Sequence, residues 1–210
     1  MPSRIVATVS LESMTPYHQS KKYDTPKLEG ESHEDYDRRT WRGHLHLGPR
    51  GSVVIPARAM HQSIVEAGAY TSSRIPGQGT KTWTRKFMSG LAIFEDIDLG
   101  LRPEDVDYID IYAHANGIRG GGPRVNRRYP AIREWSATFQ IHVLDPIITQ
   151  PVFQEALEVA GLFIGIGQYR PQMGGTAGRF QLMDLGWNES LQPVFRRSPL
   201  RRGEQAEAAE

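Results

Sequence analysis

Glycine and arginine gather in one segment of the chain, residues 161–180, in a pattern that suits the binding of an anion. The segment reads GLFIGIGQYRPQMGGTAGRF and holds six glycines and the arginines Arg170 and Arg179, with no acidic residue. Glycines let a backbone approach a ligand closely, while backbone amides and guanidinium groups bind phosphate. A dinucleotide fingerprint does not fit, because Gly165 and Gly167 follow a predicted helix instead of a strand. The alternative is that these glycines only turn the chain between a helix and a strand.

A second basic segment, residues 116–130, lies between two predicted strands and is expected at the tip of a hairpin that spans 114–133. The side chains in it that suit phosphate binding or base stacking are Arg119, Arg124, Arg127, Arg128 and Tyr129. Arginine binds phosphate with a planar fork of donors, and tyrosine offers a face on which a base can stack. Uniformly basic loops usually meet an anionic partner. A solvated hairpin that only serves solubility is the alternative.

Residues of the kind that catalyse reactions are present, but their spacing gives no catalytic or metal-binding signature. Seven histidines occur, and only His44 and His46 lie close enough to share a face of an extended segment. No further ligand stands at a metal-binding distance from them in the sequence, and the chain has no cysteine for a thiolate site. No serine lies in a nucleophile elbow. We therefore predict no enzyme, no metal and no cofactor.

The charges are segregated along the chain although the formal net charge is only +1. Residues 95–110 hold seven acids against one base, whereas residues 117–133 hold five arginines and no acid. A smaller basic cluster consists of Lys81, Arg85 and Lys86. A local basic surface attracts phosphate even on a nearly neutral protein, because fields are screened within about 8–10 Å. The two opposite blocks also suit head-to-tail self-association.

Length and composition place the chain among single-domain proteins of the cytoplasm. A chain of 210 residues is long enough for one substantial core. Its apolar runs are far shorter than the roughly 20 residues that span a bilayer, so no membrane association is expected. The first residues do not form a secretion signal. These observations predict one domain over residues 1–195, with a disordered tail over 196–210 that has no apolar periodicity.

The predicted elements alternate in a way typical of an α+β protein. Apolar residues at every second position predict strands over 4–12 and 134–143. Helical spacing predicts helices over 56–70 and 149–164, and shorter runs predict strands over 91–99, 108–113 and 179–185. The polar stretch 13–46, within a predicted loop insertion over 13–50, lacks a pattern and is expected to be mobile or ordered by a ligand. This order predicts a ferredoxin-like or RRM-like antiparallel sheet with two helices on one face and long loop insertions.

Three segments resemble the RAMP superfamily, the RRM-like subunits of CRISPR effector complexes, especially its backbone-forming members and related phage-encoded proteins. They are the opening strand that runs into VSLESMTPYHQSK, the proline-started helix of VVIPARAMHQSIVEAGAY, and the glycine-rich IGIGQYRPQMGGTAGRF. The resemblance implies that Arg119 to Arg128 lie in a thumb-like hairpin. It also implies that loops around His18 and Arg58, and from Gln168 through Tyr169 and Arg170 to Arg179, line an RNA groove.

Together these features predict a non-catalytic subunit that binds single-stranded RNA or DNA, with RNA favoured. Such a subunit is expected to associate with copies of itself along the strand or with other effector subunits. Three alternatives remain open on the sequence: a ribonuclease of RAMP type, a phage protein that binds or anneals single-stranded DNA, and a structural scaffold subunit.

Overall fold

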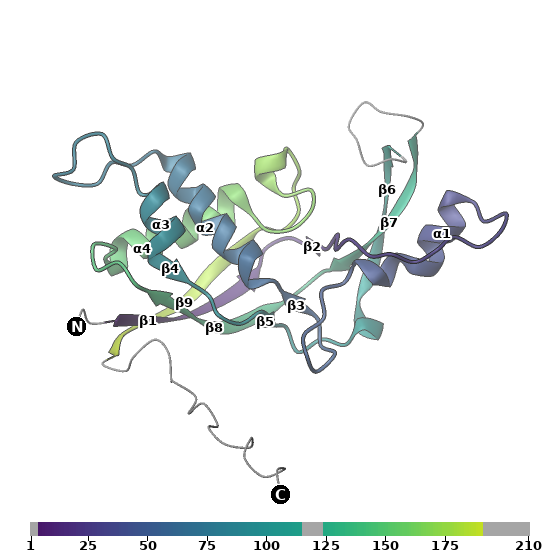
Figure 1. Cartoon of the computed structure of the whole chain (residues 1–210), viewed down its shortest axis with the longest axis horizontal. Coiled ribbons are helices and arrows are strands. Elements are labelled where there is room, and N and C mark those ends of the chain that lie inside the picture. Colours follow the sequence, from purple (N-terminus) through teal and green to yellow (C-terminus); the bar gives the residue numbers. More distant parts are fainter. Residues whose placement is uncertain (1–3, 115–123, 191–210) are drawn as a thin grey trace, which may run out of the picture.

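A four-stranded antiparallel sheet forms the centre of the protein in the computed structural model, which describes residues 4–114 and 124–190. Its strands are β1 (Arg4–Ser13), β4 (Leu91–Ala92), β8 (Ser136–Val143) and β9 (Phe180–Ser190), arranged in the order β4-β8-β1-β9. Figure 1 shows β1, β8 and β9 side by side at one end of the molecule. The strands predicted at both ends of the chain and before the second helix are therefore confirmed.

The two faces of this sheet differ as the alternating sequence predicted. Ala7, Val9 and Leu11 on β1 are at most 1% exposed and belong to the core. The opposite face is polar, and there Ser10 of β1 bonds Thr138 of β8 through their hydroxyl oxygens, 2.9 Å apart. Since side chains alternate between the faces of a strand, burial of one face alone produces this period of two.

Three helices cover the apolar face of the sheet (Figure 1). They are α2 (Ala57–Thr71), α3 (Thr84–Gly90) and α4 (Gln150–Val159). Helix α2 begins directly after Pro56, which cannot donate to the preceding turn, and buries Met60 and Ile64 against the core. Helix α4 continues into a π-helical turn, Ala160–Ile164. The helices predicted over 56–70 and 149–164 are confirmed. Helix α3 was not predicted, because it follows a basic, loop-like segment and is itself only seven residues long.

The connections between these elements are those of the ferredoxin-like fold. Along the chain the core elements follow one another as β1, α2, β4, β8, α4 and β9. Across the sheet the first and third of these strands are central, and each neighbouring pair is antiparallel. This is the βαββαβ arrangement with both helices packed on one face. The predicted fold class is confirmed by the topology itself.

A second, three-stranded sheet extends away from the central one and has the order β2-β7-β6. Strands β6 (Asp107–His114) and β7 (Arg124–Ile132) form an antiparallel hairpin, and β2 (Tyr17–His18) pairs with the base of β7. The hairpin tip lies outside the described residues, as does the predicted tail. The single strand predicted over 91–99 is corrected to two pieces, β4 and β5 (Ile97–Asp98), because β5 pairs with β3 (Val54–Ile55) instead of joining the central sheet.

The polar stretch 13–46 is folded, which corrects its interpretation as a patternless loop. It contains β2, helix α1 (His33–Thr40) and a 3-10 turn, Trp41–His44. Ser32 caps α1 by accepting a bond from the Asp35 amide, and Trp41 and Leu45 bury their side chains to 5% and 2% exposure. Figure 1 shows α1 beside the hairpin β6–β7, at the end of the molecule opposite α3. Within the described residues no helix is long and apolar enough to cross a membrane.

Candidate nucleic-acid interface

The glycine-rich loop after α4 is compact, and its glycines are needed by its own backbone. A Cβ atom at Gly175 would lie 1.8 Å from the Tyr169 carbonyl oxygen, and one at Gly178 would lie 1.9 Å from that of Ile166. Bonds across the loop connect the Ile166 amide with the Gly178 carbonyl, and the Ala177 amide with the Tyr169 carbonyl. Close approach of the loop to itself therefore requires these glycines, as the turn-forming alternative expects, and their role in binding an anion remains a prediction.

Contacts with β2 and α2 fix the position of this loop. The Gln168 amide donates to the His18 carbonyl at 3.0 Å, and the buried Ser63 hydroxyl donates to the Gly165 carbonyl at 3.0 Å. Arg170 is paired with Glu66 of α2, with 3.0 Å between guanidinium nitrogen and carboxylate oxygen. Arg170 thus holds the loop in place with a charge that is already neutralised.

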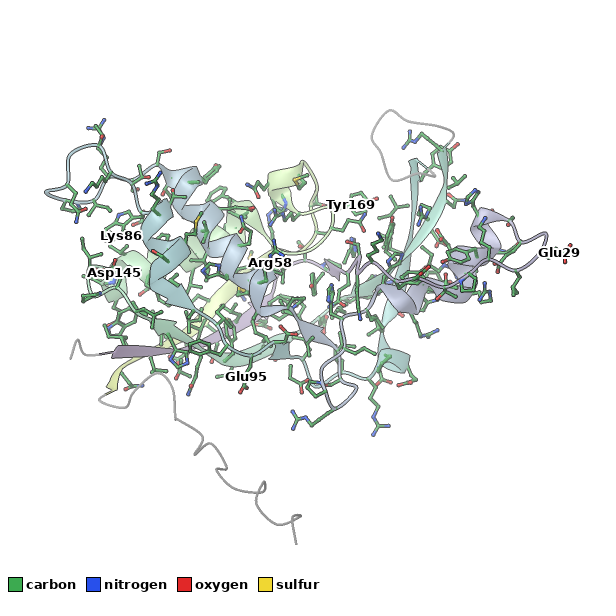
Figure 2. The ribbon with its side chains drawn as sticks, viewed as in Figure 1. Glu29, Arg58, Lys86, Glu95, Asp145 and Tyr169 are labelled. Carbon is green, nitrogen blue, oxygen red and sulfur yellow. The ribbon has the colours of Figure 1, made fainter. Side chains whose placement is uncertain are left out.

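Tyr169 is the side chain that this fixed loop presents to the hairpin. Its φ angle is +58°, a left-handed conformation that costs a non-glycine residue energy. The ring is half-buried, and Figure 2 shows it on the side of the loop that faces β7. Its centroid lies 6.3 Å from that of Tyr129 and 6.3 Å from that of His18, both in edge-on orientation. A strained aromatic residue held by a compact loop is a common feature of binding sites.

Tyr169 belongs to a connected row of rings that we call the aromatic strip, in which it lies between His18 and Tyr129. From Tyr129 on β7 the row passes to His44 at 5.0 Å and to Tyr23 at 4.6 Å between centroids. It ends at Tyr36 of α1, stacked on Tyr23 at 6.4 Å. The members of the strip are His18, Tyr23, Tyr36, His44, Tyr129 and Tyr169. They come from the stretch 13–46, from β7 and from the glycine-rich loop, and of the six only Tyr129 and His18 are buried.

Cationic side chains lie over the tyrosines of the strip. The Arg127 guanidinium is 6.0 Å from the Tyr129 ring centroid, and Lys27 and Arg39 lie 5.8 Å and 5.7 Å from that of Tyr36. These distances are those of cation–π contacts. Arg127 and Arg39 are each paired with a carboxylate, Asp37 and Glu31 respectively. The rings, on which bases can stack, are therefore the part of the strip suited to single-stranded nucleic acid.

The arginines predicted to reach outward from the hairpin are held by contacts within the chain. Arg127 pairs with Asp37 of α1, a carboxylate that is only 3% exposed. Arg128 donates two bonds of 2.7 Å to Asp110 on the neighbouring strand. Arg124 is exposed, but it donates to the Tyr112 carbonyl at 2.6 Å. Arg119 lies outside the described residues.

The same contacts bring the acidic and basic blocks of the sequence together. Besides the pair of Arg128 and Asp110, Arg133 donates to Asp107 at 2.6 Å. Antiparallel pairing of β6 with β7 places Asp110 directly opposite Arg128 and Asp107 near Arg133. Two acids of the acidic block are thus matched inside the chain, and head-to-tail assembly remains a prediction.

The remaining predicted residues fall into two groups. Arg58, in the first turn of α2, is exposed, whereas Arg179 donates to the Leu162 and Thr176 carbonyls and secures the glycine-rich loop. The basic cluster lies elsewhere: Lys86 on α3 pairs with Asp145, and Figure 2 shows this pair at the left end of the molecule, away from Tyr169, which is nearer the middle. Arg85 is on the same helix and Lys81 in the loop before it. The structure does not bring this cluster to the aromatic strip.

Burial keeps the histidines of the strip in their neutral form near pH 7. It lowers the pKa of His18, and the nearby positive charge of Arg133 lowers it further. Burial also lowers the pKa of His44. Nδ1 of His18 and Nε2 of His44 have no hydrogen-bond partner among the described residues. No group of histidine and acidic side chains in the described part of the chain is suited to hold a metal ion.

Sequence reasoning missed Tyr23, Tyr36 and His44, which contribute half of the strip. They lie in the stretch that carries no periodic pattern, so their spacing gave no signal. The cue in this stretch was a serine that can cap a short helix, in a segment rich in charges and tyrosines.

This chain matches no protein-family model and none of the curated proteins. Among solved structures it is similar to a chain in "Cryo-EM structure of the Type III-B Cmr-beta bound to cognate target RNA", with 13% identity and a TM-score of 0.48 over 89% of this chain. It spans 61% of that chain. It is also similar to Cmr6 from Pyrococcus furiosus, with 11% identity and a TM-score of 0.44, covering 87% of this chain and 100% of Cmr6. Identities this low describe a likeness of fold and do not transfer the role of any residue.

Proposed function

We propose that this chain binds single-stranded nucleic acid along the aromatic strip, without cleaving it. The observation that supports the proposal most strongly is the strip itself, a connected row of six rings that the fold gathers from the stretch 13–46, β7 and the glycine-rich loop. Packing of the protein core does not require a half-buried tyrosine in the strained, left-handed conformation of Tyr169. Stacking and charge give affinity with little dependence on base sequence.

RNA is the favoured ligand because the sequence resembles RNA-guided effector subunits, and the same resemblance makes other effector subunits the proposed protein partners. Three exposed cations can contact phosphate. Lys21 and Lys22 lie close to the strip residues His18 and Tyr23 in the sequence, and Arg58 lies at the start of α2. Each phosphate contact releases counterions, so binding should weaken steeply as salt is added.

Fluorescence anisotropy with a labelled 20-nucleotide RNA tests the proposal. Tyr169→Ala should weaken binding about tenfold, since stacking contributes roughly 1–3 kcal/mol for each base. The matched control is Tyr70→Ala, because Tyr70 is 60% exposed and stacks on Phe163 outside the strip. Equal affinity of Tyr169→Ala and the parent at low salt, or a loss of the same size in the control, would show that the strip is not the binding surface.

A ribonuclease is the second candidate, and the two neutral imidazoles of the strip favour it. His18 and His44 both lie beside tyrosine rings, and a neutral imidazole is the usual general base of such a reaction. The same labelled RNA decides between the candidates on a denaturing gel. Our proposal expects intact RNA after prolonged incubation, whereas cleavage that His18→Ala abolishes would establish the ribonuclease.

A further inference from the structure

The face of the central sheet that lies opposite the helices, which we call the open face, is polar over most of its area. Helices α2, α3 and α4 lie over the other face, and Figure 1 shows none of the remaining described helices over this one. Because side chains alternate along a strand, the residues between the buried ones point to the open face. They are mostly hydroxyl, amide and carboxyl side chains: Thr8, Ser10, Glu12, Ser136, Thr138 and Gln140.

One end of the open face is apolar instead of polar. The strand register places Ala92, His142, Val6 and Asn188 in a row across the four strands. The first three are half-buried, and Phe94, two residues beyond Ala92, is 52% exposed. The ring centroids of Phe94 and His142 lie 4.8 Å apart. This pair of rings therefore presents apolar surface of the kind that a further aromatic side chain covers well.

The described chain stops close to this row. Strand β9 ends at Ser190, two residues past Asn188 of the row. Residues 191–195 follow and read LQPVF, with three apolar side chains and a proline. His142 lies two strands and two residues away from Ser190, a distance of about 12 Å, whereas five extended residues span up to about 17 Å. Phe195 is therefore within reach of the two rings.

The charges of the open face suit this segment better than they suit a nucleic acid. Glu95 follows the first of the two rings in the sequence, is exposed, and forms no ion pair within the described residues. Figure 2 shows it at the lower side of the molecule, across the sheet from Arg58 of α2. Glu12 and Asp184 also lie on the open face. These carboxylates repel phosphate and attract Arg196, which follows the apolar segment directly.

We infer that the segment 191–195 folds back over the open face. Its Phe195 packs against Phe94 and His142, and Arg196 then lies beside the acidic side chains of this face. A segment that starts at the edge of the same sheet is held near its site at roughly millimolar effective concentration, so a contact of a few side chains is enough for docking. The docked segment covers the face on which RRM-type sheets stack bases, and this leaves the aromatic strip for nucleic acid. The docking does not depend on nucleic-acid binding by the strip.

A nitroxide spin label on Ser198→Cys tests the position of the segment in the full chain, which has no cysteine of its own. Amide signals near the label lose intensity in ¹H–¹⁵N NMR spectra. We expect the Ala92 and His142 amides to lose most of their intensity and to recover it when Phe195→Ala is added. Leu200→Ala is the matched control, because it truncates an apolar side chain beyond the segment and should leave the loss in place. Undiminished Ala92 and His142 signals, or a loss that Phe195→Ala does not change, would overturn the inference.

The ring on the sheet is tested from its own side. In the labelled chain, Phe94→Ala should restore the His142 signal as Phe195→Ala does, because it removes the surface on which Phe195 packs. Met88→Ala is the matched control, since Met88 is 58% exposed and belongs to α3 on the helical face. An equal effect of the two changes would mean that the segment has no defined site on the open face, contrary to the inference.

Two further measurements separate other occupants from the chain's own segment. If Phe94→Ala weakens RNA binding about tenfold in the anisotropy assay, the loss expected for one stacked base, the occupant is nucleic acid. If a spin-labelled chain reduces the His142 signal of a second, ¹⁵N-enriched chain without a label, the segment crosses to another copy. Either result overturns docking within one chain, whereas unchanged RNA affinity and an unchanged His142 signal in the mixture support it.

Discussion

Replacing Arg127 by methionine should destabilise the protein, because the change leaves the Asp37 carboxylate buried without its counter-charge. The Asp37 side chain is 4% exposed and that of Arg127 is 19% exposed, so water screens this pair only weakly. Methionine keeps an unbranched, flexible stem of similar length at this position. The perturbation therefore removes the charge and its hydrogen bonds with little change in packing volume.

The magnitude follows from the cost of an unpaired buried charge. Removing one partner of a buried ion pair costs roughly 3–5 kcal/mol. Protonating an ordinary aspartate at pH 7 costs about 4 kcal/mol, and this route limits the penalty. We expect a loss of about 3 kcal/mol, since α1 is near the surface and partial opening lets water in. For a chain of this size this corresponds to a fall of roughly 6–12 °C in melting temperature.

Urea denaturation of four proteins measures this value: the parent, Arg127→Met, Asp37→Leu and the double variant. The double variant should recover most of the stability, because neither charge is then buried alone. Hydrogen exchange of the α1 amides shows whether the lost stability belongs to the whole fold or to α1 opening by itself. A stability of Arg127→Met within about 0.5 kcal/mol of the parent, or a double variant less stable than both single variants, would refute the reasoning.

Three other predictions concern the glycine-rich loop, the histidines and the basic cluster. Gly178→Ala should disrupt the loop and lower the free energy of unfolding by several kcal/mol, because the new Cβ would lie 1.9 Å from a backbone oxygen. Gly174→Ala is the control: it has open space at a similar positive φ, and thermal denaturation should show a loss of only about 1–2 kcal/mol. Stability should fall as pH drops below about 6.5, because the lowered pKa values of His18 and His44 mean that the unfolded chain takes up protons there before the folded chain does; a flat melting temperature from pH 7.5 to 5.5 would contradict this. Arg85→Gln should leave RNA affinity within about twofold of the parent, and a larger loss in the anisotropy assay would return the cluster to the binding surface.

The elements predicted well from the sequence are those whose burial is one-sided over many residues. Strand β1 alternates because only one face meets the helices, and α2 repeats its apolar residues because one side meets the sheet. The two-residue strands β4 and β5 are too short to show a period, and so they merged into one predicted strand. A period can be recognised only when an element is longer than its own repeat.

The stretch 13–46 escaped prediction because its contacts with the core are few and widely spaced. Tyr17, Trp41 and Leu45 are buried, but polar residues fill the intervals and hide any pattern. Much of its attachment is polar instead: the Gln19 side chain donates to the Val54 carbonyl at 2.9 Å and accepts from the His46 amide at 2.6 Å. Such bonds depend on partners that only the tertiary fold supplies, and local sequence does not indicate them.

The arginines of the hairpin show that residue types can point to a candidate surface without showing which side chains contact a ligand. Their density drew attention to β7, where Tyr129 lies in the middle of the aromatic strip. Yet Asp37 is 90 residues from Arg127, and no local rule pairs residues so distant. The sequence lists charges in order along the chain, whereas their effect depends on which charges the fold brings within a few ångströms. Binding by this protein is therefore expected to depend more on its rings and its exposed lysines than on the arginines that dominate its sequence.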